Sequence, residues 1–256
     1  MGIVNVTPDS FSDGGKFAQT ELAVEHALKL IDEGADILDV GGESTRPNAE
    51  PVGLQEELDR VLPVIEALAS QVTIPLSIDT YKPAVMQAAI DAGVSIVNDI
   101  KAVQEPGALE VVAESTVGVC LMHMQGTPQT MQLNPFYNDV VEEVKNFLID
   151  RASFCERVGI DKTRIVLDPG FGFGKTRGHN ISLIQALTSF KDLGFPLLVG
   201  LSRKSVLGQM TGHDVDARVY ASVAAAVISA MKGARILRVH DVKATVEALR
   251  VVAAIE

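Results

Sequence analysis

The sequence predicts a single closed (β/α)8 barrel, a TIM barrel of the α/β class. Eight short runs are apolar at nearly every position, which is typical of strands covered on both faces. Amphipathic segments of helical period lie between most of these runs, so strands and helices alternate and the strands should be parallel. Eight such units within 256 residues match the usual size of the barrel. An open doubly wound sheet is the alternative fold.

Each element has its own signal along the chain. The strands are expected at residues 3–6, 35–40, 74–78, 94–97, 117–122, 164–167, 196–201 and 235–239. The helices are expected from a cap at Thr20 to Gly34, and at residues 54–69, 82–93, 139–158, 180–193, 217–232 and 241–254, with weak helical character around 108–115. No linker or low-complexity tract interrupts residues 1–256, which predicts one domain. Because the first strand begins almost at Met1, we expect a short N-terminal segment to be missing from the barrel bottom.

Composition excludes several classes of function. The chain is 47% hydrophobic and 21% charged, and none of its apolar runs reaches the roughly 18–20 residues that cross a bilayer. A net charge of −11 argues against nucleic acid as a partner, because phosphate neutralisation needs clustered Lys and Arg. We expect no export signal, and Cys120 and Cys155 lie in apolar surroundings. A reduced, cytoplasmic protein is therefore expected.

Polar residues follow the predicted strands at the point where each strand ends. In chain order they are Asn5; Asp39 with Glu43, Thr45 and Arg46; Asp79; Asn98 and Asp99; His123; Asp168; Ser202, Arg203 and Lys204; and Arg238 with His240. A single Asp or Asn after a strand is ordinary turn chemistry. In a barrel, however, all these ends converge on the face where active sites of this fold are built. The sequence therefore predicts an active site at this face.

The stretch DPGFGFGKT, residues 168–176, invites a different interpretation because it ends like a phosphate-binding P-loop. The spacing fails, since Pro169 stands where the first glycine of that motif belongs, and Lys175 stands where the dinucleotide motif needs its third glycine. Residues 177–180 also do not read as an apolar helix start. We therefore expect Lys175 to be a solvated loop residue and Asp168 to carry the chemistry, since a carboxylate can accept two parallel hydrogen bonds from a planar N–H edge.

Seven motifs, in order along almost the whole chain, resemble the dihydropteroate synthase family. They read GIVNVTPDSFSDGG, GGESTRP, SIDTYKP, VNDI, DPGFGFGK, GLSRKS and RVHDV. The resemblance implies a (β/α)8 transferase of folate biosynthesis that forms a C–N bond. Its members join p-aminobenzoate to 6-hydroxymethyl-7,8-dihydropterin pyrophosphate, give 7,8-dihydropteroate and pyrophosphate, and are sulfonamide targets. The resemblance also implies a homodimer through the C-terminal helices.

The same resemblance assigns roles to individual residues. It implies a pterin site of Asp79, Asn98, Met122, Asp168 and Lys204, a pyrophosphate site of Asn5, Thr45, Arg46, Arg238 and His240, and a p-aminobenzoate site of Phe11, Pro47, Phe173, Ser202 and Lys204. Asp79, Asp168, Lys204 and Arg238 would be the catalytic residues, and Asn5 would also bind Mg2+. Loops around residues 6–15 and 46–51 would close over the site.

The residue types agree with part of this assignment. A pterin is a flat heterocycle with a donor edge, which suits buried carboxylate and amide partners. The ends of the second and eighth strands flank the first strand in a closed barrel, so Asn5 should lie between Arg46 and Arg238. Mg2+ prefers oxygen ligands and keeps several waters and substrate phosphates, so a single protein amide is a plausible contact.

The expected chemistry is an SN1-like departure of pyrophosphate followed by attack of the p-aminobenzoate amine. Thr45, Ser202 and Ser205 would then bind rather than act as nucleophiles, and His123 would be structural. Three alternatives stay open: an aldolase-type barrel with a Schiff base on Lys204, a corrinoid-dependent methyltransferase, and a pterin-binding regulator without activity. The regulator has no use for the anion-binding residues, and the methyltransferase would leave the two arginines without a purpose.

Overall fold

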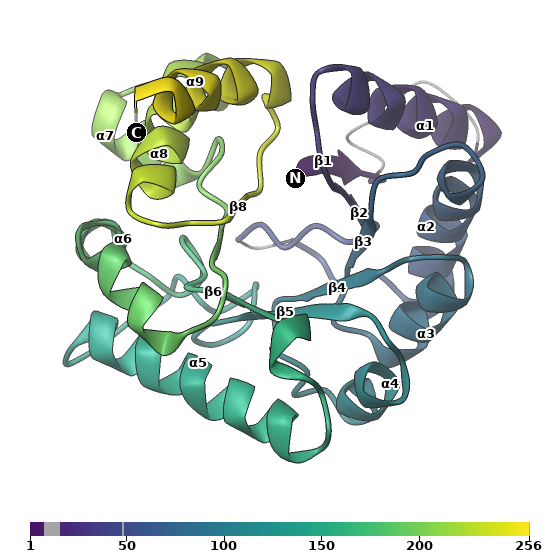
Figure 1. Cartoon of the computed structure of the whole chain (residues 1–256), viewed down its shortest axis with the longest axis horizontal. Coiled ribbons are helices and arrows are strands. Elements are labelled where there is room, and N and C mark those ends of the chain that lie inside the picture. Colours follow the sequence, from purple (N-terminus) through teal and green to yellow (C-terminus); the bar gives the residue numbers. More distant parts are fainter. Residues whose placement is uncertain (8–15, 48, 256) are drawn as a thin grey trace.

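The computed structural model describes residues 1–7, 16–47 and 49–255 of the chain. Within them, eight short parallel strands surround a central axis and helices form an outer layer (Figure 1). The strands are β1 (Gly2–Asn5), β2 (Leu38–Gly41), β3 (Leu76–Asp79), β4 (Ile96–Asp99), β5 (Gly118–Met122), β6 (Ile165–Asp168), β7 (Leu198–Val199) and β8 (Ile236–Leu237). The predicted TIM barrel is confirmed.

The barrel closes in two unequal parts. Strands β1 to β6 form one continuous sheet in sequence order, and β7 pairs with β8 as a separate ladder. Isolated parallel bridges join Leu167 to Leu197 and Gly2 to Val239, so the β7–β8 pair completes the ring between β6 and β1. Several strands are shorter than predicted, because the apolar runs include residues such as Ala35 that are buried in the turn before the ladder begins.

The helices cover the outside of the barrel. They are α1 (Lys16–Asp32), α2 (Leu54–Ala69), α3 (Pro83–Asp91), α4 (Ala108–Glu114), α5 (Val140–Arg157), α6 (Arg177–Ala186), α7 (Ser205–Thr211), α8 (Val219–Met231) and α9 (Val242–Ile255). Short 3-10 helices cover Lys162–Arg164, Leu187–Leu193 and Val215–Ala217. Helix α5 illustrates why they form: Asp139 accepts hydrogen bonds from two amides of the first turn, and Val144, Leu148 and Ala152 form a buried stripe at helical spacing.

Three helix predictions were wrong. Thr20 does not begin a helix, because α1 already starts at Lys16. Helix α6 opens at Arg177 rather than Asn180, since the Thr176 hydroxyl accepts from the His179 amide and the His179 ring accepts from the Thr176 amide. Helix α7 was not predicted, because its seven residues include Gly208, which weakens any helical signal in so short a segment.

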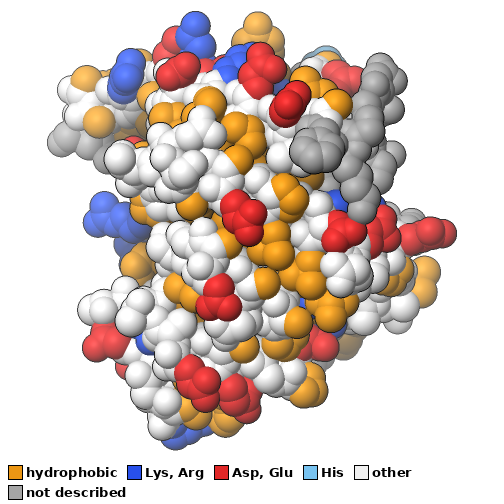
Figure 2. Space-filling model, turned by 90° about the vertical axis from the view of Figure 1, so that its right-hand side faces the viewer, with side chains coloured by type: hydrophobic (Ala, Val, Ile, Leu, Met, Phe, Trp, Pro, Cys, Tyr) orange, Lys and Arg blue, Asp and Glu red, His pale blue; other side chains and the backbone are white. Residues whose placement is uncertain are grey.

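The main core fills the space between the barrel and its helices, and a smaller cluster lies at the carboxyl ends of the strands. This second cluster contains Ile100, Met122, Met131 and Phe173. None of the helices in the described part of the chain is long and apolar enough to cross a membrane. Acidic side chains are spread over the α1–α4 side of the molecule (Figure 2), in keeping with the net charge of −11.

Candidate active site

The strand register brings the predicted residues to one end of the barrel. Asn5 is the last residue of β1, and Asp79, Met122 and Asp168 end β3, β5 and β6. Asp79 lies opposite Asn98 on β4, while Met122 lies opposite Asp168 on the next strand pair. The carboxyl ends of the parallel strands thus surround one opening. The Asp79 carboxylate lies there beside the Asn98 amide, and the Asp168 carboxylate lies beside the Met122 thioether.

Arg238 joins two carboxylates at this opening. Its Nε lies 2.6 Å from Asp39 Oδ2 and its Nη2 lies 2.6 Å from Asp79 Oδ2. The Asn98 amide donates to the same Asp39 oxygen at 3.0 Å. The predicted pterin residues Asp79 and Asn98 and the predicted anion-binding residue Arg238 are therefore part of one hydrogen-bonded group.

Asp39 was noted at the end of the second predicted strand but was given no binding role, although it belongs to this group. Its side chain is fully buried, and its Oδ1 atom has no hydrogen-bond partner among the described residues. A buried acceptor without a partner is costly unless a ligand or water supplies a donor. An aspartate inside an otherwise apolar strand was the sequence signal for this role.

Burial controls the protonation of the acids and bases here. It raises the pKa of Asp79 to about 7, although the Arg238 charge opposes the shift. Burial also raises the pKa of Asp168, against the charge of Lys204. The pKa of Lys204 falls to about 8 by burial, opposed by Asp168. Burial and the charge of Arg238 therefore act in opposite directions on the carboxyl group of Asp79.

Lys204 lies beside the aromatic wall of the opening. Its Nζ donates to the Phe171 carbonyl and stands 4.6 Å from the centroid of the Phe173 ring, which is a cation–π contact. Phe173 and Met122 belong to the small apolar cluster at the strand ends. The structure therefore assembles one wall from residues predicted for the pterin and p-aminobenzoate sites.

Ser202 and His240 form a neighbouring pair. The Ser202 hydroxyl lies 3.0 Å from His240 Nδ1 and accepts from the His240 amide at 3.1 Å. Burial lowers the pKa of His240 to about 4, and the charges of Arg238, Arg203 and Arg46 add to the effect. His240 is therefore neutral at pH 7, and an anion bound nearby would raise its pKa.

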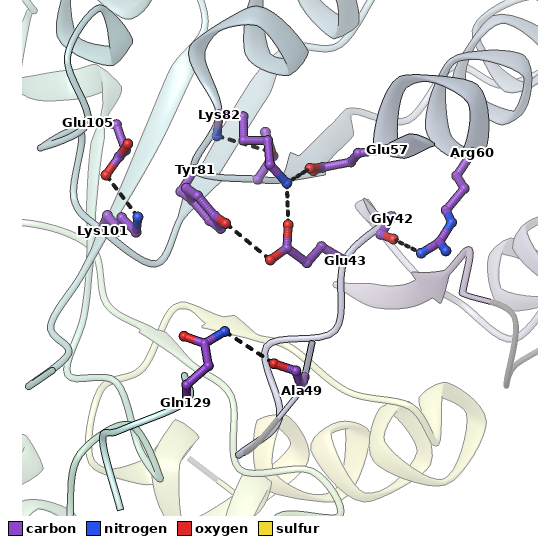
Figure 3. Close-up of polar contacts among 11 residues, drawn as sticks. Gly42, Glu43, Ala49, Glu57, Arg60, Tyr81, Lys82, Lys101, Glu105 and Gln129 are labelled. Atoms are coloured by element: carbon purple, nitrogen blue, oxygen red, sulfur yellow. Dashed lines mark hydrogen bonds and ion pairs between the residues drawn. The ribbon is translucent and has the colours of Figure 1, made fainter. Parts of the chain in front are cut away.

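The loop after β2 is held by a network of charged side chains (Figure 3). The Lys82 ammonium is shared between Glu43 and Glu57, and the Tyr81 hydroxyl donates to Glu43 at 3.1 Å. Arg60 Nη1 donates to the Gly42 carbonyl at 2.8 Å from α2. Glu43 directly precedes the segment with Thr45 and Arg46, so the network fixes the base of the segment predicted to bind pyrophosphate.

The outer residues of this loop are less enclosed. Thr45 is half-buried, whereas Arg46 and Pro47 are exposed. Gln129, from the loop after β5, donates to the Ala49 carbonyl at 3.1 Å and ties the outer loop to its neighbour (Figure 3). Phe11, the remaining predicted contact for p-aminobenzoate, lies outside the described residues.

The expectation of a solvated Lys175 was wrong. Lys175 is 3% exposed and its Nζ lies 2.9 Å from His123 Nδ1. The prediction failed because the residues adjacent to Lys175 in the sequence carry no sign that backbone carbonyls surround its ammonium group in the folded chain. His123, predicted to be structural, is buried and packs edge-on against Phe147 at a centroid distance of 5.0 Å.

Comparison with known proteins agrees with this geometry. The family model described as "Pterin binding enzyme" matches residues 1–240. A dihydropteroate synthase of Escherichia coli K12 is 54% identical over 254 residues, which cover 99% of this chain and 90% of that protein. The Haemophilus influenzae dihydropteroate synthase is 50% identical over 251 residues, covering 98% of this chain and 91% of that protein.

Solved structures give the same answer. The Yersinia pestis dihydropteroate synthase with a sulfonamide drug complex has a TM-score of 0.95 and 51% identity, covering 100% of this chain and 93% of that one. The Xanthomonas albilineans dihydropteroate synthase in complex with 7,8-dihydropteroate has a TM-score of 0.91 and 51% identity, covering 100% and 92%. Sequence, barrel and neighbours agree, and the chain belongs to the pterin-binding enzymes, within the dihydropteroate synthase family.

Proposed function

We propose that this protein condenses p-aminobenzoate with 6-hydroxymethyl-7,8-dihydropterin pyrophosphate, forming 7,8-dihydropteroate and releasing pyrophosphate in folate biosynthesis. The observation that carries this function is the opening where Arg238 joins Asp39 and Asp79 while Lys204 lies beside Phe173, in a chain 54% identical to a dihydropteroate synthase. An assay of pyrophosphate release with both substrates tests it. No release from the folded protein with both substrates present would contradict the function.

The buried carboxylates suit recognition of the pterin. Asp79, Asn98 and Asp168 present acceptor and amide groups at the strand ends, while Met122 and Lys204 flank them. The N–H edge of a pterin would supply a donor to Asp39 Oδ1, which has no partner among the described residues. Replacement of Asp168 by Asn is expected to weaken pterin binding, measured by calorimetry with a pterin analogue.

The reaction places opposite demands on the two sides of the opening. Arg238, His240, Thr45 and Arg46 would stabilise the departing pyrophosphate, and the negative charges of Asp79 and Asp168 would favour the cation that develops on the pterin. We propose that pyrophosphate leaves before the amine of p-aminobenzoate attacks. Pyrophosphate–pterin exchange without p-aminobenzoate would support this order, and strict dependence on p-aminobenzoate would contradict it.

Ser202, Phe173, Pro47, Phe11 and Lys204 are proposed to hold p-aminobenzoate. The cation–π pair of Lys204 and Phe173 places a positive charge over an aromatic ring, a combination of charge and apolar surface that suits an aromatic carboxylate. The Yersinia pestis relative was solved with a sulfonamide drug complex. We expect a sulfonamide to compete with p-aminobenzoate here, measured as a rise in its apparent KM.

Mg2+ is the proposed ion for the pyrophosphate. In the described part of the chain, no group of three or more His, Cys, Asp or Glu side chains could hold a metal by itself. Asn5, half-buried at the end of β1, offers one amide oxygen, which suits an ion whose other ligands are waters and phosphate oxygens. Titration of Mg2+ into the chelator-treated enzyme with pyrophosphate, with Asn5→Ala as comparison, tests this contact by calorimetry.

The C-terminal helices offer the face proposed for a homodimer. A groove between α8 and α9 is lined by Val227, Met231, Ala248, Val251, Val252 and Ile255. Met231, Val251 and Ile255 are more than half exposed, and exposed apolar patches often mark interaction sites. Light scattering should give twice the mass of one chain, and Val251→Asp should reduce the measured mass to that of a single chain.

A cytoplasmic location is proposed from the two free cysteines, which are both buried. Cell fractionation tests this location.

A further inference from the structure

The loop from Gly170 to Gly174 has an unusual feature: a side chain binds every one of its carbonyl oxygens. The Gly170 and Phe173 carbonyls accept from Lys175 Nζ at 2.9 Å, the Phe171 carbonyl from Lys204 Nζ, the Gly172 carbonyl from Gln132 Nε2 at 2.6 Å, and the Gly174 carbonyl from Tyr137 Oη at 2.8 Å. The loop therefore has a fixed path although it belongs to no helix or strand.

The glycines explain why side chains must supply these bonds. Gly170 and Gly174 have φ angles of 68° and 62°, which glycine adopts without strain. A Cβ atom at Gly170 would lie 1.9 Å from the His123 carbonyl oxygen, so the loop runs directly against the end of β5. In this conformation the carbonyls cannot join a regular ladder, and buried carbonyls need other donors.

Lys175 is the most enclosed of these donors. Its Nζ lies 2.9 Å from the Gly170 carbonyl, the Phe173 carbonyl and His123 Nδ1, and 3.3 Å from the His123 carbonyl. An ammonium has three donors, which match the three contacts at 2.9 Å. Burial lowers the pKa of Lys175 well below its ordinary value, while the charge of Asp168 opposes the shift. The carbonyl acceptors also favour the protonated form.

The same lysine connects the two predicted binding surfaces. Phe173 stands opposite Lys204 in the proposed p-aminobenzoate wall. Gly170 donates its amide to Asp168 Oδ1 at 2.7 Å, so it is tied to the proposed pterin residue. By holding the Gly170 and Phe173 carbonyls at one point, Lys175 sets the distance between the Asp168 end and the Phe173 end of the loop.

We propose that Lys175 is a positioning residue for p-aminobenzoate: from beneath the loop, where it also contacts His123, it holds Phe173 in place against Lys204 without touching the substrate. The inference rests on the proposed function, because Lys175 would position a residue of the proposed p-aminobenzoate site. It gives Lys175, the lysine of the Gly-Lys-Thr segment, a role in placing p-aminobenzoate and no role in phosphate binding.

Lys175→Met tests the proposal, since methionine has a similar length and cannot donate. We expect the KM for p-aminobenzoate to rise about tenfold, because small displacements of a positioning surface lower reactivity strongly. The affinity for dihydropterin pyrophosphate, measured by calorimetry, should change less than about twofold. Lys243→Met, on an exposed position of α9, is the matched control and should leave both values unchanged.

A second variant keeps the test decisive if Lys175→Met folds poorly. Lys175→Gln keeps a donor and should recover part of the lost affinity for p-aminobenzoate. In Lys175→Met the His123 ring, followed by nitrogen NMR, should show a higher pKa than in the wild type, where the pKa is about 3 and the Lys175 charge contributes after burial.

The outcomes separate this inference from the proposed function. If the wild-type protein releases no pyrophosphate, the proposed function fails whatever Lys175 does. If the wild type is active and Lys175→Met changes neither KM, or changes both equally while only lowering the unfolding midpoint, Lys175 is merely structural and this inference is wrong.

Discussion

Two loops frame the opening of the barrel, and they are held in opposite ways. The loop after β2 is fixed at its base by ion pairs of Glu43, Glu57 and Lys82, and its outer residues Arg46, Pro47, Glu50 and Pro51 are exposed. In the loop after β6, each carbonyl of residues 170–174 is bound by a side-chain donor, with Lys175 buried beneath the loop. The comparison contrasts an adaptable side, which is proposed to bind the pyrophosphate, with a rigid side, which is proposed to support p-aminobenzoate.

The largest effect is expected from breaking the rigid side. In Gly170→Ala the new Cβ would meet the His123 carbonyl, and the residue would also keep a positive φ. We expect the free energy of unfolding to fall by more than about 3 kcal/mol and the KM for p-aminobenzoate to rise, because backbone atoms cannot move aside. Urea unfolding and steady-state kinetics measure the two effects.

Gly212→Ala is the control that separates the cost of a positive φ from the cost of a steric clash. Gly212 also has a positive φ, of 74°, but a Cβ there would meet no atom within 4 Å. It should cost only about 1 kcal/mol. Equal losses in the two variants would mean that close contact with β5 does not govern the rigid loop.

The next effect comes from the adaptable side. Lys82→Met leaves the fully buried Glu57 without its counter-charge, and Glu57 Oε1 already has no partner among the described residues. We expect a loss of about 3 kcal/mol in the free energy of unfolding, since an uncompensated buried charge is costly. The KM for dihydropterin pyrophosphate should rise while that for p-aminobenzoate stays nearly constant.

A double variant identifies the cause of this loss. Glu57→Met combined with Lys82→Met removes both charges and should recover much of the stability lost in Lys82→Met alone. If stability falls further in the double variant, the buried charge is not the source of the effect.

A smaller effect concerns the pH dependence of stability, to which the buried Asp79 contributes. The pKa of Asp79 in the folded state is about 7, raised by burial and also by the charges of Asp39 and Glu57, whereas an unfolded aspartate titrates near 3.9. Between these values the folded state binds more protons, so stability should fall as the pH rises from about 4 to 7. Asp79→Asn should remove part of that fall, on the order of 1 kcal/mol, in urea unfolding at pH 5 and 7. The rest of the slope should persist, because burial also raises the pKa of Asp99 to about 6.

The smallest effect on the fold is expected from Arg46, in the exposed part of the loop after β2. Arg46→Ala should leave the unfolding midpoint unchanged, because its side chain is exposed. The KM for dihydropterin pyrophosphate should rise about fivefold at low salt and differ less from the wild type at high salt, where exposed charges are screened. A salt-independent difference would mean that Arg46 acts through shape rather than charge.

The barrel and the placement of its polar residues followed from patterns that the sequence carries locally. Apolar runs, helical spacing and polar strand ends predict where Asp79, Asn98 and Arg238 come together, since parallel strands end at one face. Asp39 was noted at a strand end but given no binding role, and Lys175 was misjudged because its environment arises only in the folded chain. The burial of Lys175 depends on carbonyls that glycines with positive φ turn toward it, and no local pattern encodes that direction.

The two-part closure of the barrel has a consequence for local opening. Lys204 and Arg238 follow β7 and β8, the two strands that form only a two-residue ladder and join the main sheet through single bridges. Segments with few backbone bonds open at lower free energy than a continuous sheet. Amide hydrogen exchange should therefore be faster at β7 and β8 than at β2 to β5, and each opening would withdraw both cations while the carboxylates of the main sheet stay in place.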